Sequence, residues 1–149
     1  MISEHFGALK SRLEEHVGLS GKVRDTSWAT WSGDAPTYER TNYVILFGGS
    51  PTEVGGARQG RSQDSSDELL FDFTARAVGT SPTACRAVLD AVMGQFFKWT
   101  PEVDGRRCTR LYYPPSQNPD VKPDNSIRPP LFFADTEWSF RSFRASSGS

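Results

Sequence analysis

Apolar residues recur at helical spacing near the start of the chain. Positions three and four apart form one stripe on a helix, and this stripe consists of Phe6, Leu9, Leu13 and Val17. Ser3 suits the N-cap, and Gly18 suits the left-handed residue that follows a helix. The pattern predicts an amphipathic helix over residues 3–17, followed by a short strand around Val23.

Two β-rich stretches flank a long polar segment. Residues 42–47 are a β-rich run typical of a buried strand, and residues 68–78 alternate between apolar and polar side chains. The intervening residues 50–67 are mostly Gly, Ser, Gln, Arg and Asp, a composition typical of a functional or disordered loop. We therefore predict a long β-hairpin with a flexible arm at its tip.

Trp28 and Trp31, which precede the first of these β-rich stretches, lie in an irregular segment and are expected to pack over an edge of the core.

A second helix has the clearest boundaries. Ser81 supplies an N-cap and Pro82 occupies the first helical position, where its missing N–H costs nothing. One face then carries Cys85, Val88, Leu89, Val92 and Phe96. The segment from Lys98 to Pro101 ends the helix.

The C-terminal part predicts two strands separated by a proline-rich loop. After a turn at Asp104-Gly105, residues 106–113 form a strand, and the final strand spans about 131–143 with Phe132, Trp138 and Phe140 on one face. The loop, residues 114–130, holds six prolines, which cannot donate to a sheet ladder and keep it extended. Residues 145–149 are expected to fray.

This order of elements predicts an α+β fold: a small mixed or antiparallel sheet with both helices on one face. The opposite face is expected to meet solvent or another copy. With 149 residues, the chain is expected to form one domain. The formal net charge is −1, but residues 1–75 carry 7 basic and 11 acidic side chains, and residues 76–149 carry 10 and 7. Such a split suits head-to-tail contact between copies.

Several protein classes are disfavoured. The longest apolar run, Tyr43 to Phe47, is far shorter than the roughly 20 residues that span a bilayer. The N-terminal residues are acidic where a secretory signal is basic and apolar, so we expect no secretion by that route and no membrane partner. Two cysteines, Cys85 and Cys108, cannot build a disulfide scaffold. We expect synthesis in a reducing cytoplasm.

One segment resembles a phosphate-binding loop. Residues 55–62 match G-x-x-x-x-G-K-[ST] except that Arg61 replaces the lysine. That motif requires a helix directly after it, whereas here the loop continues towards a strand. The context favours a surface arm over a nucleotide site, although a small nucleotide-binding enzyme remains an alternative.

The remaining candidates for chemistry have structural explanations. His5 and His16 lie about three turns apart on the first helix, too far apart to share a metal, and we expect both to be solvated. Asp64, Asp67 and Glu68 are more typical of solvating charge than of a cation site. Cys85 lies on an apolar stripe, which favours a core role, and Cys108 could approach it.

The basic cluster comprises Arg106, Arg107 and Arg110. Strand alternation places Arg106 and Arg110 on one side and Arg107 on the other. Surface ion pairs are the default role, and contact with a neighbouring protein or with DNA phosphate is the sharper hypothesis. Neither a carboxylate pair nor a Ser/His/Asp set stands out, so we expect neither an enzyme nor a cofactor.

From Tyr43 to Arg144 the chain resembles the tail terminator and tail-completion proteins of long-tailed bacteriophages. The resemblance covers about two-thirds of the chain and rests on element order and on diffuse segments. These are Tyr43 to Pro51, Phe73 to Pro82, Val88 to Val92, Gly105 to Cys108, and the strand after Arg128-Pro129-Pro130.

The resemblance implies a structural virion protein. It implies a hexameric ring at the head-proximal end of the tail, which caps the tail tube, contacts the major tube protein and the head-side stopper or connector, and lets DNA pass without sequence-specific binding. Candidate contact residues are Arg58, Arg61, Arg106, Arg107, Arg110, Pro115 and Pro119. Alternatives are another head–tail joining protein, the nucleotide-binding enzyme, or an α+β domain that only dimerises.

Overall fold

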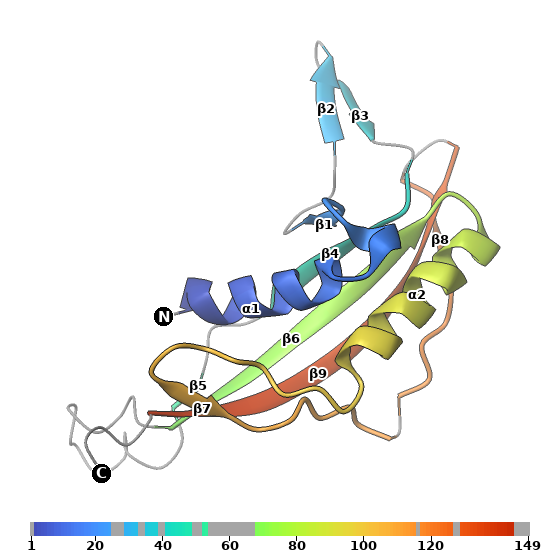
Figure 1. Cartoon of the computed structure of the whole chain (residues 1–149). Helices are drawn as coiled ribbons and strands as arrows, with labels where there is room; N and C mark the ends of the chain where they lie inside the picture. Colours follow the sequence, from blue (N-terminus) through green and yellow to red (C-terminus); the bar gives the residue numbers. More distant parts are fainter. Residues whose placement is uncertain are drawn as a thin grey trace.

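A mixed seven-stranded sheet with two α-helices forms the body of the protein (Figure 1). The computed structural model describes residues 2–24, 29–32, 35–38, 41–48, 52–53, 68–115, 117–126 and 129–144. The helices are α1 (Ile2–Glu14), the short 3₁₀ helix η1 (Val17–Leu19) and α2 (Pro82–Phe96). The strands are β1 (Val23–Arg24), β2 (Ala29–Ser32), β3 (Ala35–Tyr38), β4 (Tyr43–Gly48), β5 (Thr52–Glu53), β6 (Glu68–Gly79), β7 (Arg106–Cys108), β8 (Lys122–Asp124) and β9 (Leu131–Arg144).

The long strands β6 and β9 form the centre of the sheet. They pair antiparallel from Glu68 opposite Phe143 to Gly79 opposite Phe132. β4 pairs antiparallel with β6 on its other side, which confirms the predicted hairpin, and β5 extends that edge. The main order is β1-β4-β6-β9-β7, with β8 also beside β9 and with β1 parallel to β4. The residues between β5 and β6, which include most of the predicted arm, lie outside the described part.

Both helices lie on one side of this sheet, as predicted (Figure 1). The alternation of β6 is confirmed, because its apolar residues face the helices and are buried: Leu69, Phe71, Phe73, Ala75 and Ala77. The predicted apolar face of β9 meets them through Trp138 and Phe140. This side of the sheet and the two helices enclose the main core.

Helix α2 follows its sequence signals closely. The Ser81 hydroxyl accepts a hydrogen bond from the Ala84 N–H at 3.1 Å, and Pro82 begins the helix. The predicted apolar face is buried at Cys85, Val88, Val92 and Phe96. The helix ends where Lys98 adopts a left-handed conformation with φ 62°.

Helix α1 is shorter than predicted. It begins at Ile2, so Ser3 lies inside its first turn, and it ends at Glu14. Val17 is therefore not part of the buried stripe and is 91% exposed. The chain turns into η1, where the His16 side chain accepts a hydrogen bond from the Gly18 N–H, and Gly21, not Gly18, has positive φ.

Three predictions about strands are wrong. Part of the segment expected to be irregular forms the β2–β3 hairpin, although the packing of its indoles lies outside what the structure describes. The predicted strand 106–113 is confined to β7, with an isolated bridge from Tyr112 to Ser139. Part of the proline-rich loop forms β8, in which Pro123 lies at the sheet edge, where its missing N–H is tolerated.

Candidate assembly surfaces

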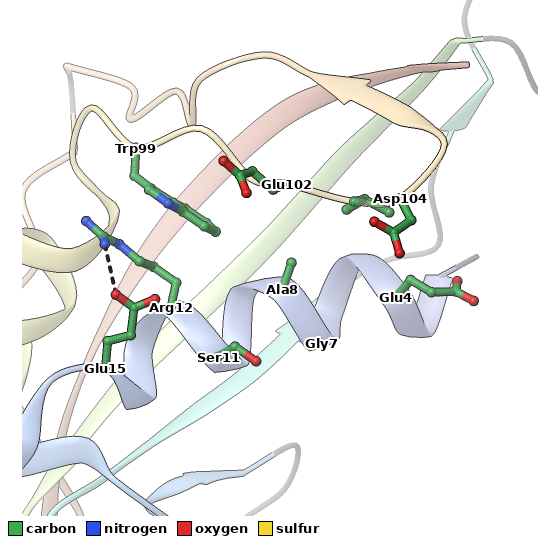
Figure 2. A pocket seen from close by; sticks show the side chains of 10 residues that line it. Glu4, Gly7, Ala8, Ser11, Arg12, Glu15, Trp99, Glu102 and Asp104 are labelled. Carbon is green, nitrogen blue, oxygen red and sulfur yellow. Dashed lines mark hydrogen bonds and ion pairs between the residues drawn. The ribbon is translucent and has the colours of Figure 1, made fainter. Parts of the chain in front are cut away.

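Helix α1 lies between two grooves of opposite charge. On one side it faces the segment that joins α2 to β7 (Figure 2). This acidic groove has a volume of about 610 Å³ and is lined by four carboxylates, those of Glu4, Glu15, Glu102 and Asp104.

Arg12 is the cation of the acidic groove, and its side chain is held within the protein. Its Nε donates to the Gln95 carbonyl at 2.7 Å, while Gln95 Nε2 donates back to the Arg12 carbonyl at 2.7 Å. Its guanidinium carbon is 5.4 Å from the centre of the Trp99 ring, and Nη1 is 3.3 Å from Glu15 Oε1 (Figure 2). The described lining of this groove therefore carries more carboxylates than cations.

The groove on the other side of α1 is apolar and basic. This basic groove lies between α1 and the edge formed by β1 and β4, with a volume of about 550 Å³. Its described lining contains two cations, Lys10 and Arg24, and no carboxylate. The apolar part of the lining comes from Phe6, Val23, Leu46 and Phe47. Phe47 is 38% exposed, unusually open for a phenylalanine on a strand.

The face of the sheet away from the helices carries a second apolar cluster. Its buried members are Tyr43, Ile45, Val78 and Leu131. Beside it Arg76 and Asp135 form a bidentate ion pair, with distances of 2.7 and 3.0 Å. The Arg76 guanidinium also lies 5.3 Å from the Phe47 ring centre and 4.7 Å from that of Phe133. The hydrogen bond to Asp135 raises the pKa of Arg76 above its ordinary value.

The candidate arginines separate into different environments. Arg106 donates from Nε to Ser142 Oγ and from Nη2 to the Ser142 carbonyl, both at 2.9 Å, so it is held against β9. Arg107 is exposed on the opposite side of β7, with its guanidinium 6.0 Å from the Phe143 ring centre. This opposition confirms the predicted alternation for these two residues. Arg110 is exposed beyond the end of β7, so alternation does not extend to it, and Arg58 and Arg61 lie outside the described residues.

The proline-rich segment is partly fixed to the sheet. The Gln117 amide donates to the Glu137 carbonyl and accepts from the Glu137 N–H, each at 2.6 Å. Together with β8, this side chain holds the segment along β9. Pro115 is exposed and Pro119 half-buried. Of the two candidate contact prolines, only Pro115 is therefore exposed.

The prediction that His5 is solvated is wrong. His5 is fully buried, its ring stacks on Phe71 at 4.3 Å, and its Nε2 is 2.8 Å from Ser142 Oγ. The sequence held a signal for this, because His5 is four residues before Leu9 and therefore on the same stripe. His16 is exposed, as expected. Both histidines make hydrogen bonds within the protein, and neither belongs to a metal-binding cluster of the described residues.

The two cysteines are free and lie far apart along β9. Cys85 contacts Ala77, whose β9 partner is Ala134, whereas Cys108 pairs with Ser142, eight residues further along. At about 3.3 Å per residue that separation is roughly 26 Å, so Cys108 does not approach Cys85.

Glu68, the one described member of the suggested cation set, forms an ion pair with Arg141 at 2.7 Å.

Burial raises the pKa of the Cys85 thiol to about 11 and raises that of Cys108. A raised pKa in the folded state favours the protonated thiol, so this contribution to stability is complete below pH 9 and is lost as pH approaches 11. We expect the free energy of unfolding to fall between these pH values by up to about 2 kcal/mol more in the wild type than in Cys85→Ala. Urea unfolding across this range measures the difference, and parallel curves would contradict it.

No protein-family model matches this chain, and no curated protein shows significant similarity to it. Within the described residues, neither helix is long and apolar enough to cross a membrane.

Proposed function

We propose that this protein is a tail terminator of a long-tailed bacteriophage. Its role is geometric: copies form a sixfold ring that caps the tail tube, stops its growth and joins it to the head-side connector. The observation that carries the proposal is the arrangement of the segments that resemble the family. Their described parts lie on β4, β6, α2, β7 and β9, and these elements form one contiguous unit around the β6–β9 pair.

The two charged grooves support a ring more than a simple dimer. Because α1 separates them, one copy presents an acidic groove on one side and a basic groove on the other. Complementary surfaces at different places on one molecule favour head-to-tail contact, which closes into a ring when the rotation allows. Within such a ring, DNA passes through the lumen, and the tube protein and the stopper or connector contact opposite rims. The ring lies in the virion at the head-proximal end of the tail, and its subunits are made in the host cytoplasm.

Deleting the gene distinguishes a terminator from a stopper. A terminator ends polymerisation of the tube, so its loss is expected to give tubes of uncontrolled length alongside unjoined heads. Loss of a stopper leaves finished tails of normal length. Electron microscopy of lysates measures the tube lengths, and expression of the wild-type gene in trans is the control. Normal tube lengths in the deletion would contradict the terminator role and favour the other joining protein.

The nucleotide-binding enzyme makes a different prediction. A ligand that binds only the native state raises the melting temperature, by an amount that grows with its concentration relative to Kd. Since the sequence that follows residues 55–62 predicts a continued loop leading to a strand and not the helix that a phosphate-binding loop needs, we expect millimolar ATP or GTP to leave the melting temperature unchanged. A shift of several degrees that Arg61→Ala abolishes would contradict the structural role.

A further inference from the structure

An acidic turn forms the rim of the acidic groove. The Arg106 N–H donates to the Val103 carbonyl at 3.0 Å, which closes a β-turn with Asp104 and Gly105 at its centre. Gly105 has φ 74°, a left-handed conformation that glycine adopts without strain, so the turn is well defined. Its side chains alternate in exposure: Glu102 is exposed, Val103 half-buried and Asp104 exposed.

The basic groove has the complementary pattern. Its floor is apolar, with Phe6 and Leu46 among its lining residues, and its cations are Lys10 and Arg24. Lys10 is exposed on α1, whereas Arg24 is half-buried on β1. An apolar side chain between two carboxylates therefore matches an apolar floor that carries two cations.

We propose that the turn Glu102–Gly105 of one copy docks into the basic groove of the next copy. Val103 then covers the apolar floor, and Glu102 and Asp104 face Lys10 and Arg24. The turn faces one side of α1 (Figure 2), whereas the basic groove lies between α1 and the edge formed by β1 and β4, so a copy cannot fill its own groove with its own turn. The contact is heterologous, and each copy retains one unused turn and one unused groove until a ring closes. This inference rests on the proposed ring and names the surfaces that form it.

The contact is expected to be weak for a single pair of copies. Stable interfaces bury about 1,200–2,000 Å² in total, more than one four-residue turn contributes. Closing the ring uses every turn and every groove at once, so assembly is favoured over open chains. Because charges on the surface are screened by salt, we expect association to weaken as ionic strength rises.

Zero-length carbodiimide cross-linking tests the contact directly. Equal amounts of ¹⁴N- and ¹⁵N-labelled protein are mixed at millimolar concentration and low salt, and the same reaction is run on purified virions. We expect a peptide pair that joins Lys10 to Glu102 or Asp104 and carries both isotopes. Absence of the mixed pair from the purified protein, together with absence of the Lys10 link from virions, overturns the proposal. A dominant link to the groove from any other carboxylate or from another virion protein overturns it as well.

Charge reversal separates docking from folding. We expect Lys10→Glu alone and the pair Glu102→Lys/Asp104→Lys alone each to reduce association at least tenfold in sedimentation. An equimolar mixture of these two proteins brings the unchanged acidic turn of the first together with the unchanged basic groove of the second. It is expected to regain association, with cross-links only between the two variants. Failure of the mixture to recover, with both variants folded by circular dichroism, overturns the proposal.

Matched reversals on the exposed face of α2 serve as controls. Arg86→Glu changes the charge by the same amount as Lys10→Glu, and Asp90→Lys by half as much as the double variant, at positions away from both grooves. Both are expected to leave the cross-link yield unchanged. The outcomes also separate this contact from the proposed function. A ring in virions without the Lys10 link overturns the docking alone. The link in purified protein, combined with absence of the protein itself from virions, overturns the terminator role alone.

Discussion

Replacing Gly79 with alanine is expected to destabilise the protein by about 3 kcal/mol, near the upper end for added volume in a packed site. Gly79 ends β6, and the chain turns back into α2 within two residues. A Cβ at this position would lie 2.4 Å from the Cys85 nitrogen and 2.7 Å from its Cα. Backbone atoms cannot move aside as a flexible side chain can, so the first turn of α2 must shift away from the sheet.

Gly94→Ala is the matched control for this prediction. Gly94 also belongs to α2, but an added Cβ meets nothing within 4 Å. Alanine has the higher helix propensity, so this variant is expected to gain up to about 1 kcal/mol. Chemical denaturation of both variants measures the contrast. Equal stabilities for the two variants would contradict the close packing of β6 against α2.

Replacing Trp138 with alanine is expected to cost about 3–5 kcal/mol, a large share of the roughly 5–15 kcal/mol that stabilises a typical domain. Trp138 is 2% exposed, and its ring centre is 5.5 Å from that of Phe96 on α2 and 4.8 Å from that of Tyr113. Its Nε1 donates to Thr136 Oγ1 at 2.8 Å, which in turn donates to the Ala75 carbonyl at 3.1 Å. The variant removes both a large apolar side chain and the first of these two hydrogen bonds.

Tyr112→Ala is the control for Trp138→Ala. Tyr112 is 56% exposed and meets β9 through backbone hydrogen bonds with Ser139, which alanine retains. Its replacement is expected to change stability by less than about 0.5 kcal/mol, as is usual for surface positions. Thermal and urea unfolding measure both variants. A similar loss in both would show that Trp138 does not anchor the core.

Secondary structure was predicted correctly from the sequence where a local signal agrees with the burial of the same residues. The cap at Ser81, the proline after it and the apolar face of α2 are all encoded within one segment. The alternation along β6 and β9 likewise identifies the side that faces the helices. These local patterns were enough to predict the α+β fold and the side on which the helices pack.

The errors fall where a distant partner decides the structure. His5 is buried because Ser142, on the last strand, supplies a hydrogen-bond partner inside the core. β8 forms despite Pro123 because β9 offers an edge on which one missing donor is tolerated. Val17 continues the helical spacing, yet the chain leaves α1 at Glu14, and spacing alone does not encode that exit.

The charged grooves could not be predicted from the sequence for the same reason. The turn at Asp104-Gly105 was recognisable, but its place across α1 from Lys10 depends on how the helix packs on the sheet. The arginine cluster was recognisable too. The hydrogen bond from Arg106 to Ser142, however, depends on the register between β7 and β9. Both grooves, and the contact of Arg106 with Ser142, are formed by elements that come together only in the folded chain.

High-resolution cryo-electron microscopy of intact virions is the decisive measurement for the proposed ring. We expect six copies of this chain in a closed ring between the last layer of the tail tube and the head-side connector, around a lumen wide enough for DNA. The chain's absence from mature virions, or its presence elsewhere in the particle or without sixfold arrangement, would contradict it.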